Sequence, residues 1–178
     1  MKRGFIFWFT GLSGAGKTTL AESVRDQLNA QGIQTSILDG DDVRNRLHRH
    51  LGFSEAEIKE NNALIAGLCE SERKQADVVL VPIISPYAES RAKAREKLSP
   101  GFVEVFIKAE IATLEKRDTK GLYAKARKGE MNNLIGYSSG APYERPENPD
   151  LIIDTGRLHI DGAVDRLTEF ICTQIPEE

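Results

Sequence analysis

The 178-residue chain is predicted to be an α/β protein, with helices on both faces of a parallel sheet of about five strands. Short apolar runs alternate with amphipathic stretches along the chain, which is the order produced by right-handed βαβ units. Hydrophobic residues make up 40% and charged residues 29% of the sequence, as in an ordinary globular domain. Because no repeat, linker or low-complexity segment divides it, we expect a single three-layer α/β/α domain over residues 1–178.

The first half of the chain opens with a strand and a helix. Phe5 to Thr10 is an apolar run of the length of a buried strand. Leu20, Val24 and Leu28 then recur at the spacing of one helix face. Ser54 precedes a later helical pattern and is expected to be its N-cap. The elements expected up to residue 75 are a strand over 5–10, a helix over 17–30, a strand over 35–38 and helices over 42–50 and 55–75.

The second half continues the alternation. Val78 to Val81 is a strongly β-type run, and Pro82 is expected at its C-terminal edge because proline cannot donate to a central ladder. Residues 129–149 contain several turn residues and little periodicity, so we expect a long loop there. The other expected elements are a strand over 77–84, a helix over 89–97, a strand over 103–107, a helix over 111–117, a helical turn over 121–128, a strand over 151–153 and a helix over 162–173.

Composition argues against several classes of partner. Lysine and arginine number 24 against 27 aspartates and glutamates, a net charge of -3, so neither a nucleic-acid polymer nor an anionic membrane is an expected partner. Cys69 and Cys172 are too few for a disulfide framework. No apolar stretch approaches the ~18 residues of a membrane span, and a cytoplasmic location is expected. His48 and His50 lack zinc-ligand spacing.

The segment from Gly11 to Thr18 reads GLSGAGKT and fits the phosphate-binding loop G-x-x-x-x-G-K-[ST] at every position. Its glycines let backbone N–H groups surround phosphate oxygens, and the following helix directs its positive end at the same anion. Lys17 adds a charge at the β and γ phosphates, and the Thr18 hydroxyl can ligate Mg²⁺. ATP and Mg²⁺ are therefore expected. The candidate ATP-binding residues here are Gly11, Ser13, Gly14, Ala15, Gly16, Lys17, Thr18 and Thr19.

Acidic residues follow the second predicted strand. Asp39, Asp41 and Asp42 come at its C-terminal end, where ligands bind in open α/β sheets. One carboxylate can hold Mg²⁺ and another can accept the proton of an attacking hydroxyl. The alternative is that Asp41 or Asp42 is only the N-cap or a first-turn acid of the next helix. Arg44, on the first turn of that helix, is a candidate for binding a substrate phosphate or sulfate, or else forms a surface ion pair.

A basic cluster lies beside the long loop. Lys120, Lys125, Arg127 and Lys128 fall within or beside the predicted turn. We expect a mobile lid over about residues 118–149, with Arg117, Lys120 and Arg127 reaching the triphosphate. The alternative is a solvated helix face. A guanine-reading N-K-x-D segment does not occur, so the loop is assigned to a kinase rather than a GTPase switch.

Six motifs in order resemble adenylyl-sulfate (APS) kinase over residues 4–155. They are the phosphate loop 11–18, Leu38-Asp39-Gly40-Asp41, Leu51-Gly52-Phe53-Ser54, Ile84-Ser85-Pro86-Tyr87, the run 120–127, and Pro142-Tyr143-Glu144. The resemblance implies a P-loop NTPase-type fold and phosphorylation of the 3′-hydroxyl of adenosine 5′-phosphosulfate by Mg-ATP, giving PAPS and ADP. It also favours a homodimer.

The resemblance implies roles for individual positions. Asp39 and Asp41 match the acids near the reactive hydroxyl and Mg²⁺, with Thr18 and Asp39 as the metal ligands. Ser85 matches a serine described as a phosphoserine intermediate, but in-line transfer needs none, so we expect it to position the substrate. The positions matching the substrate pocket are Asp41, Arg44, Phe53, Asn61, Ile84, Ser85 and Leu134.

The acceptor half departs from the family pattern. The position of an arginine that contacts the anionic end of APS is Ile58, and an Arg-Arg pair is replaced by Ala63-Leu64. Leu134 stands where an aromatic ring usually stacks on adenine. Three interpretations stay open: an APS kinase with compensating contacts from Lys59 or Tyr137, a 3′-kinase of another 5′-activated nucleotide such as cytidine diphosphoramidate, and a non-catalytic P-loop nucleotide-binding module.

Overall fold

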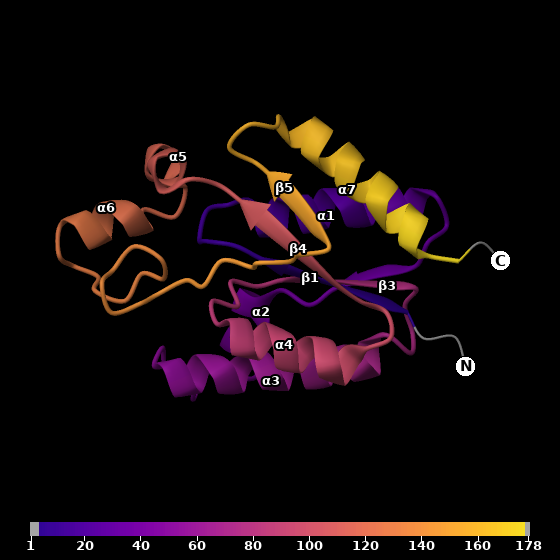
Figure 1. The fold of residues 1–178 in the computed structure, drawn as a ribbon, viewed down its shortest axis with the longest axis horizontal. Coiled ribbons are helices and arrows are strands. Elements are labelled where there is room, and N and C mark those ends of the chain that lie inside the picture. Colours follow the sequence, from indigo (N-terminus) through magenta and orange to yellow (C-terminus); the bar gives the residue numbers. More distant parts are fainter. Residues whose placement is uncertain (1–3, 177–178) are drawn as a thin grey trace.

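The computed structural model describes residues 4–176, which form a sheet of five parallel strands (Figure 1). The order across the sheet is β2-β3-β1-β4-β5, and each neighbouring pair is parallel. This confirms the predicted parallel sheet of about five strands. The strands are β1 (Phe5–Thr10), β2 (Thr35–Ile37), β3 (Val78–Pro82), β4 (Phe102–Lys108) and β5 (Leu151–Asp154).

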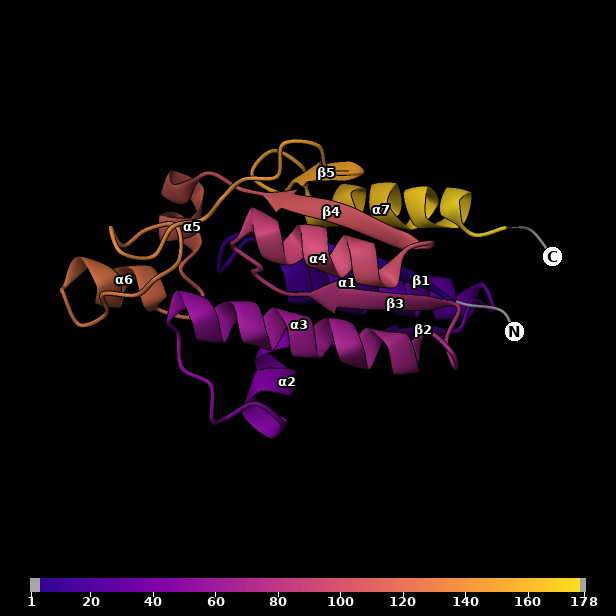
Figure 2. The same ribbon diagram turned by 60° about the horizontal axis from the view of Figure 1, so that its bottom comes forward.

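Helices cover both faces of the sheet, as predicted. In Figures 1 and 2, α1 and α7 lie on one face, and α3 and α4 lie side by side on the other. The three-layer α/β/α architecture is therefore confirmed. The helices are α1 (Lys17–Ala30), α2 (Gly40–Arg46), α3 (Glu55–Glu72), α4 (Ala88–Leu98), α5 (Ile111–Arg117), α6 (Leu122–Arg127) and α7 (Ile160–Gln174).

The central strand β1 explains why the N-terminal run is apolar without interruption. Successive side chains of a strand point to opposite faces. Phe7 and Phe9 pack into the core beneath α1 and α7, whereas Ile6 and Trp8 pack into the core beneath α3 and α4. All four side chains are fully buried. A strand covered on both faces needs apolar residues at every position, and this one sets the phosphate loop at the carboxyl end of the sheet.

The helix expected over 42–50 departs most from the prediction, and the other element boundaries lie within about three residues of it. Pro82 is the last residue of β3, as expected. Ser54 caps α3 in a capping box with Glu57, also as expected. The helix expected over 42–50 instead begins at Gly40 and ends at Arg46, because the residue before it serves as the cap.

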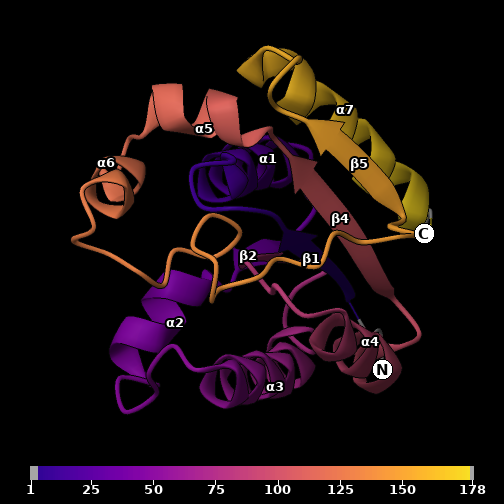
Figure 3. The same cartoon turned by 60° about the vertical axis from the view of Figure 1, so that its left-hand side comes forward.

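The segment between β4 and β5 lies beyond the carboxyl ends of the strands. Helices α5 and α6 extend past these ends, and the chain returns to β5 through an irregular stretch (Figures 2 and 3). No helix or strand occurs between α6 and β5, which agrees with the loop expected over 129–149. The predicted lid therefore stands at the edge of the sheet where the phosphate loop opens.

None of the helices within residues 4–176 combines the length and the apolar character needed to cross a bilayer.

Candidate functional site

The loop between β1 and α1 holds its lysine on its own backbone. Gly14 and Gly16 have φ angles of 78° and 93°, which glycine adopts without strain. Lys17 is buried, and its Nζ donates to the carbonyl oxygens of Gly11 (2.8 Å) and Leu12 (2.9 Å). Two carbonyls thus fix the ammonium over the concave side of the loop.

The charge on Lys17 is costly in this position. Burial lowers the pKa of its amine from 10.5 to about 8, and the negative charge of Asp41 only partly opposes that effect. The nearby charge of Lys120 lowers the pKa further. An anion bound over the loop would favour the protonated amine again. The loop is therefore suited to a phosphate ligand.

Two side chains from distant parts of the chain fix the loop backbone. The Tyr123 hydroxyl on α6 donates to the Ser13 carbonyl at 2.8 Å, and Thr155, which follows β5, donates from Oγ1 to the Ala15 carbonyl at 2.9 Å. The Arg117 guanidinium in turn donates to the Thr155 carbonyl. The predicted lid and the end of the sheet thus both contact the phosphate loop.

Asp39 has two roles, and one of them, capping α2, was considered for Asp41 or Asp42 in the sequence analysis. Its Oδ1 accepts hydrogen bonds from the N–H groups of Asp41 (2.9 Å) and Asp42 (3.3 Å), so Asp39 is the N-cap of α2. Its Oδ2 accepts a hydrogen bond from the Thr18 hydroxyl at 2.7 Å. Asp41 and Asp42 are therefore not the cap that the alternative interpretation considered, but they are acids of the first turn of α2, as that interpretation also held.

This arrangement leaves Asp41 with a different partner. Its carboxylate forms an exposed ion pair with Lys120 at 2.9 Å, and this contact joins the acids to the predicted lid. Within residues 4–176 no group of three or more His, Cys, Asp and Glu side chains could hold a metal ion by itself. The Thr18 and Asp39 oxygens instead form a pair of hard donors beside the phosphate loop, which is how Mg²⁺ is held when phosphates supply its other ligands.

A cavity of about 450 Å³ connects the phosphate loop to the acids and to one face of α3. All the predicted binding and catalytic residues line it except Gly11, Arg127 and Leu134. Gly11 contributes the carbonyl that holds Lys17. Arg127 is exposed and pairs with Glu115 at 3.9 Å. Leu134 is buried in the core, and its neighbour Ile135 faces the cavity instead.

The α3 wall of the cavity carries Ile58, Asn61 and Asn62. Asn61 is oriented by His48, whose Nδ1 lies 2.8 Å from its Oδ1. Sequence reasoning missed Asn62 and Ile135, which line the cavity, and His48, which orients Asn61. Asn62 could have been found from its position, because it follows Ile58 by one helical turn and so shares its face.

Arg44 lies in the last turn of α2, not in the first turn as expected. Its Nη1 donates to the carbonyls of Leu51 (3.0 Å) and Gly52 (2.6 Å). Its guanidinium lies 4.6 Å from the centre of the Phe53 ring, a cation–π distance. The ring itself is 60% exposed. Arg44 therefore shapes the loop that presents an exposed aromatic side chain at the cavity rim.

Ser85 has an unusual backbone conformation at the opposite wall. Its φ is 45°, in the left-handed region that non-glycine residues rarely adopt, and its buried Oγ has no hydrogen-bonding partner within residues 4–176. The preceding carbonyl, that of Ile84, accepts a hydrogen bond from the Thr10 hydroxyl at 2.6 Å. Such strain persists only where the surroundings enforce it.

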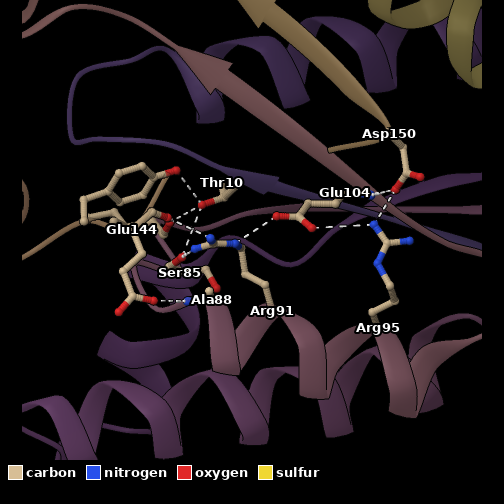
Figure 4. Close-up of polar contacts among 10 residues, drawn as sticks. Thr10, Ser85, Ala88, Arg91, Arg95, Glu104, Glu144 and Asp150 are labelled. Atoms are coloured by element: carbon tan, nitrogen blue, oxygen red, sulfur yellow. Dashed lines mark hydrogen bonds and ion pairs between the residues drawn. The ribbon is translucent and has the colours of Figure 1, made fainter. Parts of the chain in front are cut away.

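A buried arginine supplies that enforcement (Figure 4). Arg91 donates from Nη1 to the Ser85 carbonyl and from Nη2 to the Glu144 carbonyl, both at 2.7 Å. Its Nε forms an ion pair with Glu104 at 2.8 Å. The Ala88 N–H also donates to the Glu144 carboxylate at 2.6 Å. The cavity loop and the segment that returns from the predicted lid are thus fixed to each other.

Neither side chain considered as a compensating contact faces the cavity. Lys59 forms ion pairs at 2.7 Å with both Glu55 and Glu89. The Tyr137 hydroxyl donates to Glu115 at 2.9 Å. Neither residue lines the cavity, so in this conformation neither supplies the charge or the ring that the acceptor half lacks.

The family model for adenylylsulphate kinase matches residues 3–154. An adenylyl-sulfate kinase of Geotalea uraniireducens is 43% identical over 95% of this chain and 81% of its own length. One of Bacteroides fragilis is 41% identical over 98% of this chain and 86% of its own length.

A solved structure agrees with these relatives. The Mycobacterium tuberculosis APS kinase CysC in complex with AMPPNP and APS superimposes with a TM-score of 0.90 at 41% identity, over 96% of this chain and 99% of that one. A match of this extent, with the phosphate loop, the acids and the cavity in one place, means that the chain belongs to the adenylylsulphate kinase family.

Proposed function

We propose that the protein transfers the γ-phosphoryl group of Mg-ATP to the 3′-hydroxyl of adenosine 5′-phosphosulfate, giving PAPS and ADP. One observation carries the proposal: a phosphate-binding loop, a hydroxyl–carboxylate pair and an acceptor wall share a single cavity. Relatives with 41–43% identity are adenylyl-sulfate kinases, and the CysC structure contains AMPPNP and APS.

The ATP half of the proposal uses the loop and the lid. Backbone N–H groups of residues 13–19 would surround the phosphates, and Lys17 would leave its two carbonyl partners to contact them. Arg117 and Lys120 lie on the lid side of the same cavity. Closure of the lid segment over about residues 118–149 would carry Arg127 toward the phosphates.

Thr18 and Asp39 are the proposed Mg²⁺ ligands, directly or through water, because their oxygens already lie 2.7 Å apart beside the loop. The ion would neutralise the charge on the β and γ phosphates. This role fits the absence, within residues 4–176, of a protein-only metal cluster, since Mg²⁺ bound to nucleotides takes few protein ligands.

Asp41 is the proposed general base. Asp39 is engaged by Thr18 and by the cap of α2, whereas Asp41 pairs with the exposed side chain of Lys120. Once Lys120 turns to the phosphates, Asp41 can accept the proton of the 3′-hydroxyl. The hydroxyl oxygen forms the new bond to the γ-phosphorus while the bond to the ADP oxygen breaks. No covalent enzyme intermediate is needed, so Ser85 is assigned to positioning.

The acceptor contacts complete the proposal. Phe53 offers an exposed ring to a base, and Arg44 fixes that ring. Asn61 and Ile84 line the walls on either side. Leu134 is buried in the core, so it would affect the acceptor only indirectly, through its neighbour Ile135, which lines the cavity.

A second acceptor is favoured by one specific observation. The α3 wall presents Ile58 to the cavity, and a cation would be expected there for a phosphosulfate. The alternative is a 3′-kinase for another 5′-activated nucleotide, such as cytidine diphosphoramidate. This acceptor offers the same hydroxyl with a different base and a different 5′ group.

A coupled ADP-release assay with a panel of acceptors tests these functions. Saturable turnover of APS at low micromolar concentration would support the first and sink the second. Turnover of the cytidine compound alone would do the reverse. If ATP binds with Mg²⁺ but no acceptor elicits ADP release, the chain is a non-catalytic nucleotide-binding module.

We also propose a cytoplasmic homodimer. Cys69 and Cys172 are both free thiols, as is usual in a reducing compartment. A hexameric APS kinase of Thiobacillus denitrificans, of which this chain covers 30%, is a structural neighbour with a TM-score of 0.69 at 31% identity; it supports self-association, and the dimer itself rests on the family resemblance. Light scattering after size-exclusion chromatography measures the assembly: a mass of one chain would reject the dimer.

A further inference from the structure

Asn62 carries an unpaired acceptor at the cavity. The residue is only 2% exposed and lines the cavity from α3. Its Nδ2 donates to the Ile58 carbonyl at 2.7 Å, which fixes the orientation of the amide. Its Oδ1 is buried and has no hydrogen-bonding partner within residues 4–176. Buried polar atoms are nearly always paired, so this oxygen lacks a donor that a ligand could supply.

The neighbouring asparagine does not share this property. The Oδ1 atom of Asn61 is already within hydrogen-bonding distance of His48. Asn62 and Asn61 therefore differ although they are adjacent on one helix and line one cavity. Besides Asn61, the α3 residue that lines the cavity beside Asn62 is Ile58, which precedes it by one turn and is itself buried.

The chemistry of the missing partner follows from the charges around the cavity. Four cations line it, and each is held by another part of the chain. Those cations are Lys17 on loop carbonyls, Arg44 on the 51–52 carbonyls, Arg117 on Thr155 and Lys120 on Asp41. None comes from α3, whose Lys59 is paired outside the cavity. A buried oxygen acceptor on an uncharged wall suits a neutral hydrogen-bond donor such as an –NH₂ group and disfavours an anionic oxygen.

We propose that Asn62 Oδ1 accepts a hydrogen bond from an –NH₂ group of the acceptor nucleotide and thereby determines acceptor specificity. Two parts of such a nucleotide offer this chemistry: the exocyclic amino group of the base and an amide on the terminal phosphorus. The inference rests on the proposed function, because it requires a nucleotide acceptor in this cavity. A site built to pair with a donor rejects an analogue that lacks it.

The test compares matched acceptors in the wild type and in Asn62→Leu, a variant with the same branched side-chain skeleton but without the amide. One pair, APS and purine riboside 5′-phosphosulfate, differs only in the base amino group. The other, cytidine diphosphoramidate and CDP, exchanges the terminal amide for an oxygen. We expect the wild type to prefer the amino member of one pair by about 10-fold or more in kcat/KM, and Asn62→Leu to lose that preference.

Stability provides a second readout. Because Asn62→Leu removes an unpaired buried oxygen, we expect its Tm to be equal to or higher than that of the wild type, whereas loss of a merely structural residue would lower it. The control is Ser36→Ala, which removes another buried unpaired oxygen on β2, outside the cavity lining. This control should keep the acceptor preference.

The possible results distinguish the role of Asn62 from the proposed kinase activity. The role of Asn62 would be overturned if the wild type turned over both members of each pair equally well. It would also be overturned if the preference persisted in Asn62→Leu. Neither result would contradict the proposed kinase activity. Absence of ADP release with all four nucleotides would overturn the proposed function and this inference with it. The pair whose preference is lost in Asn62→Leu shows whether Asn62 contacts the amino group of the base or the amide on the terminal phosphorus.

Discussion

The two halves of the cavity differ in how far the chain completes its own contacts. On the ATP side, the Lys17 ammonium is hydrogen-bonded to two carbonyls, and Tyr123 and Thr155 hold the loop backbone. On the acceptor side, the buried Oδ1 of Asn62 and the buried Oγ of Ser85 have no hydrogen-bonding partner within the described residues. The ATP half pairs its own polar groups before a ligand binds, whereas two buried polar atoms of the acceptor half have no partner until a ligand supplies one.

This difference indicates where specificity resides. The proposed phosphate site is the same whichever acceptor is bound. Atoms that depend on a ligand for their hydrogen bonds discriminate between ligands, because a wrong one leaves them unpaired. We therefore expect damage to the ATP half to abolish turnover of every acceptor, and changes to the acceptor half to redistribute it.

The largest expected effect is that of Lys17→Ala. Removal of the charge nearest the phosphates should lower kcat by about 100- to 1,000-fold or more for every acceptor. The folded state should not suffer, since Lys17 is a buried charge with a lowered pKa. Steady-state ADP release together with thermal unfolding measures both. Normal activity in this variant would reject the loop as the ATP site.

The second-largest effect is expected at the proposed general base, Asp41. Asp41→Asn should lower kcat by about 100-fold or more with little change in the KM for ATP. Asp42→Asn is the matched control, because Asp42 is the next residue on α2 and does not line the cavity. If both variants lose activity equally, the carboxylates act only through the stability of α2, and the assignment of Asp41 fails.

The two halves also differ in how well they could be predicted. The phosphate loop is one contiguous motif between a strand and a helix, so local sequence predicts both its geometry and its ligand. The acceptor wall brings together His48, Asn62 and Ile135 from segments far apart in the chain. Their meeting depends on how α3 and the lid pack, and alignment by motif placed Leu134 one residue away from the position that faces the cavity.

The N-cap of α2 was also not predictable from the sequence. Three aspartates follow β2, and sequence alone could not decide which of them caps α2. The structure gives that role to Asp39, and the choice determines which carboxylate stays available as a base. By contrast, the cap at Ser54 was predictable because Glu57 completes a capping box at fixed spacing.

A smaller effect is expected from restoring a charge on the acceptor wall. Ile58→Arg should raise kcat/KM for APS by about 10-fold if the apolar wall limits binding of an anionic 5′ group. Leu134→Phe should not help, because Leu134 is buried in the core and a larger ring there overpacks it, with an expected cost of about 1–3 kcal/mol. Comparison of the two single variants by APS titration and thermal unfolding separates these effects. No gain from Ile58→Arg would mean that the α3 wall does not face the 5′ group.

The smallest expected effect is a pH dependence that runs in opposite directions with and without ligand. The pKa of Lys17 is about 8 in the folded protein and about 10.4 in an unfolded chain. Between these values the unfolded chain binds more protons at this residue, so the contribution of Lys17 to stability rises with pH. The stability advantage of Lys17→Met over the wild type should therefore shrink from pH 8 to pH 10.

Nucleotide binding requires the protonated amine, so the affinity for Mg-ATP should fall as pH rises above 8, by at most about 10-fold per pH unit. Calorimetry in two buffers of different ionisation enthalpy should then show proton uptake on binding. These opposed trends distinguish a lysine held for a phosphate from one that merely stabilises the loop. If Lys17 only stabilised the loop, stability and Mg-ATP affinity would change with pH in the same direction, or binding would take up no proton. Either result would mean that the loop is a structural turn and not the ATP site.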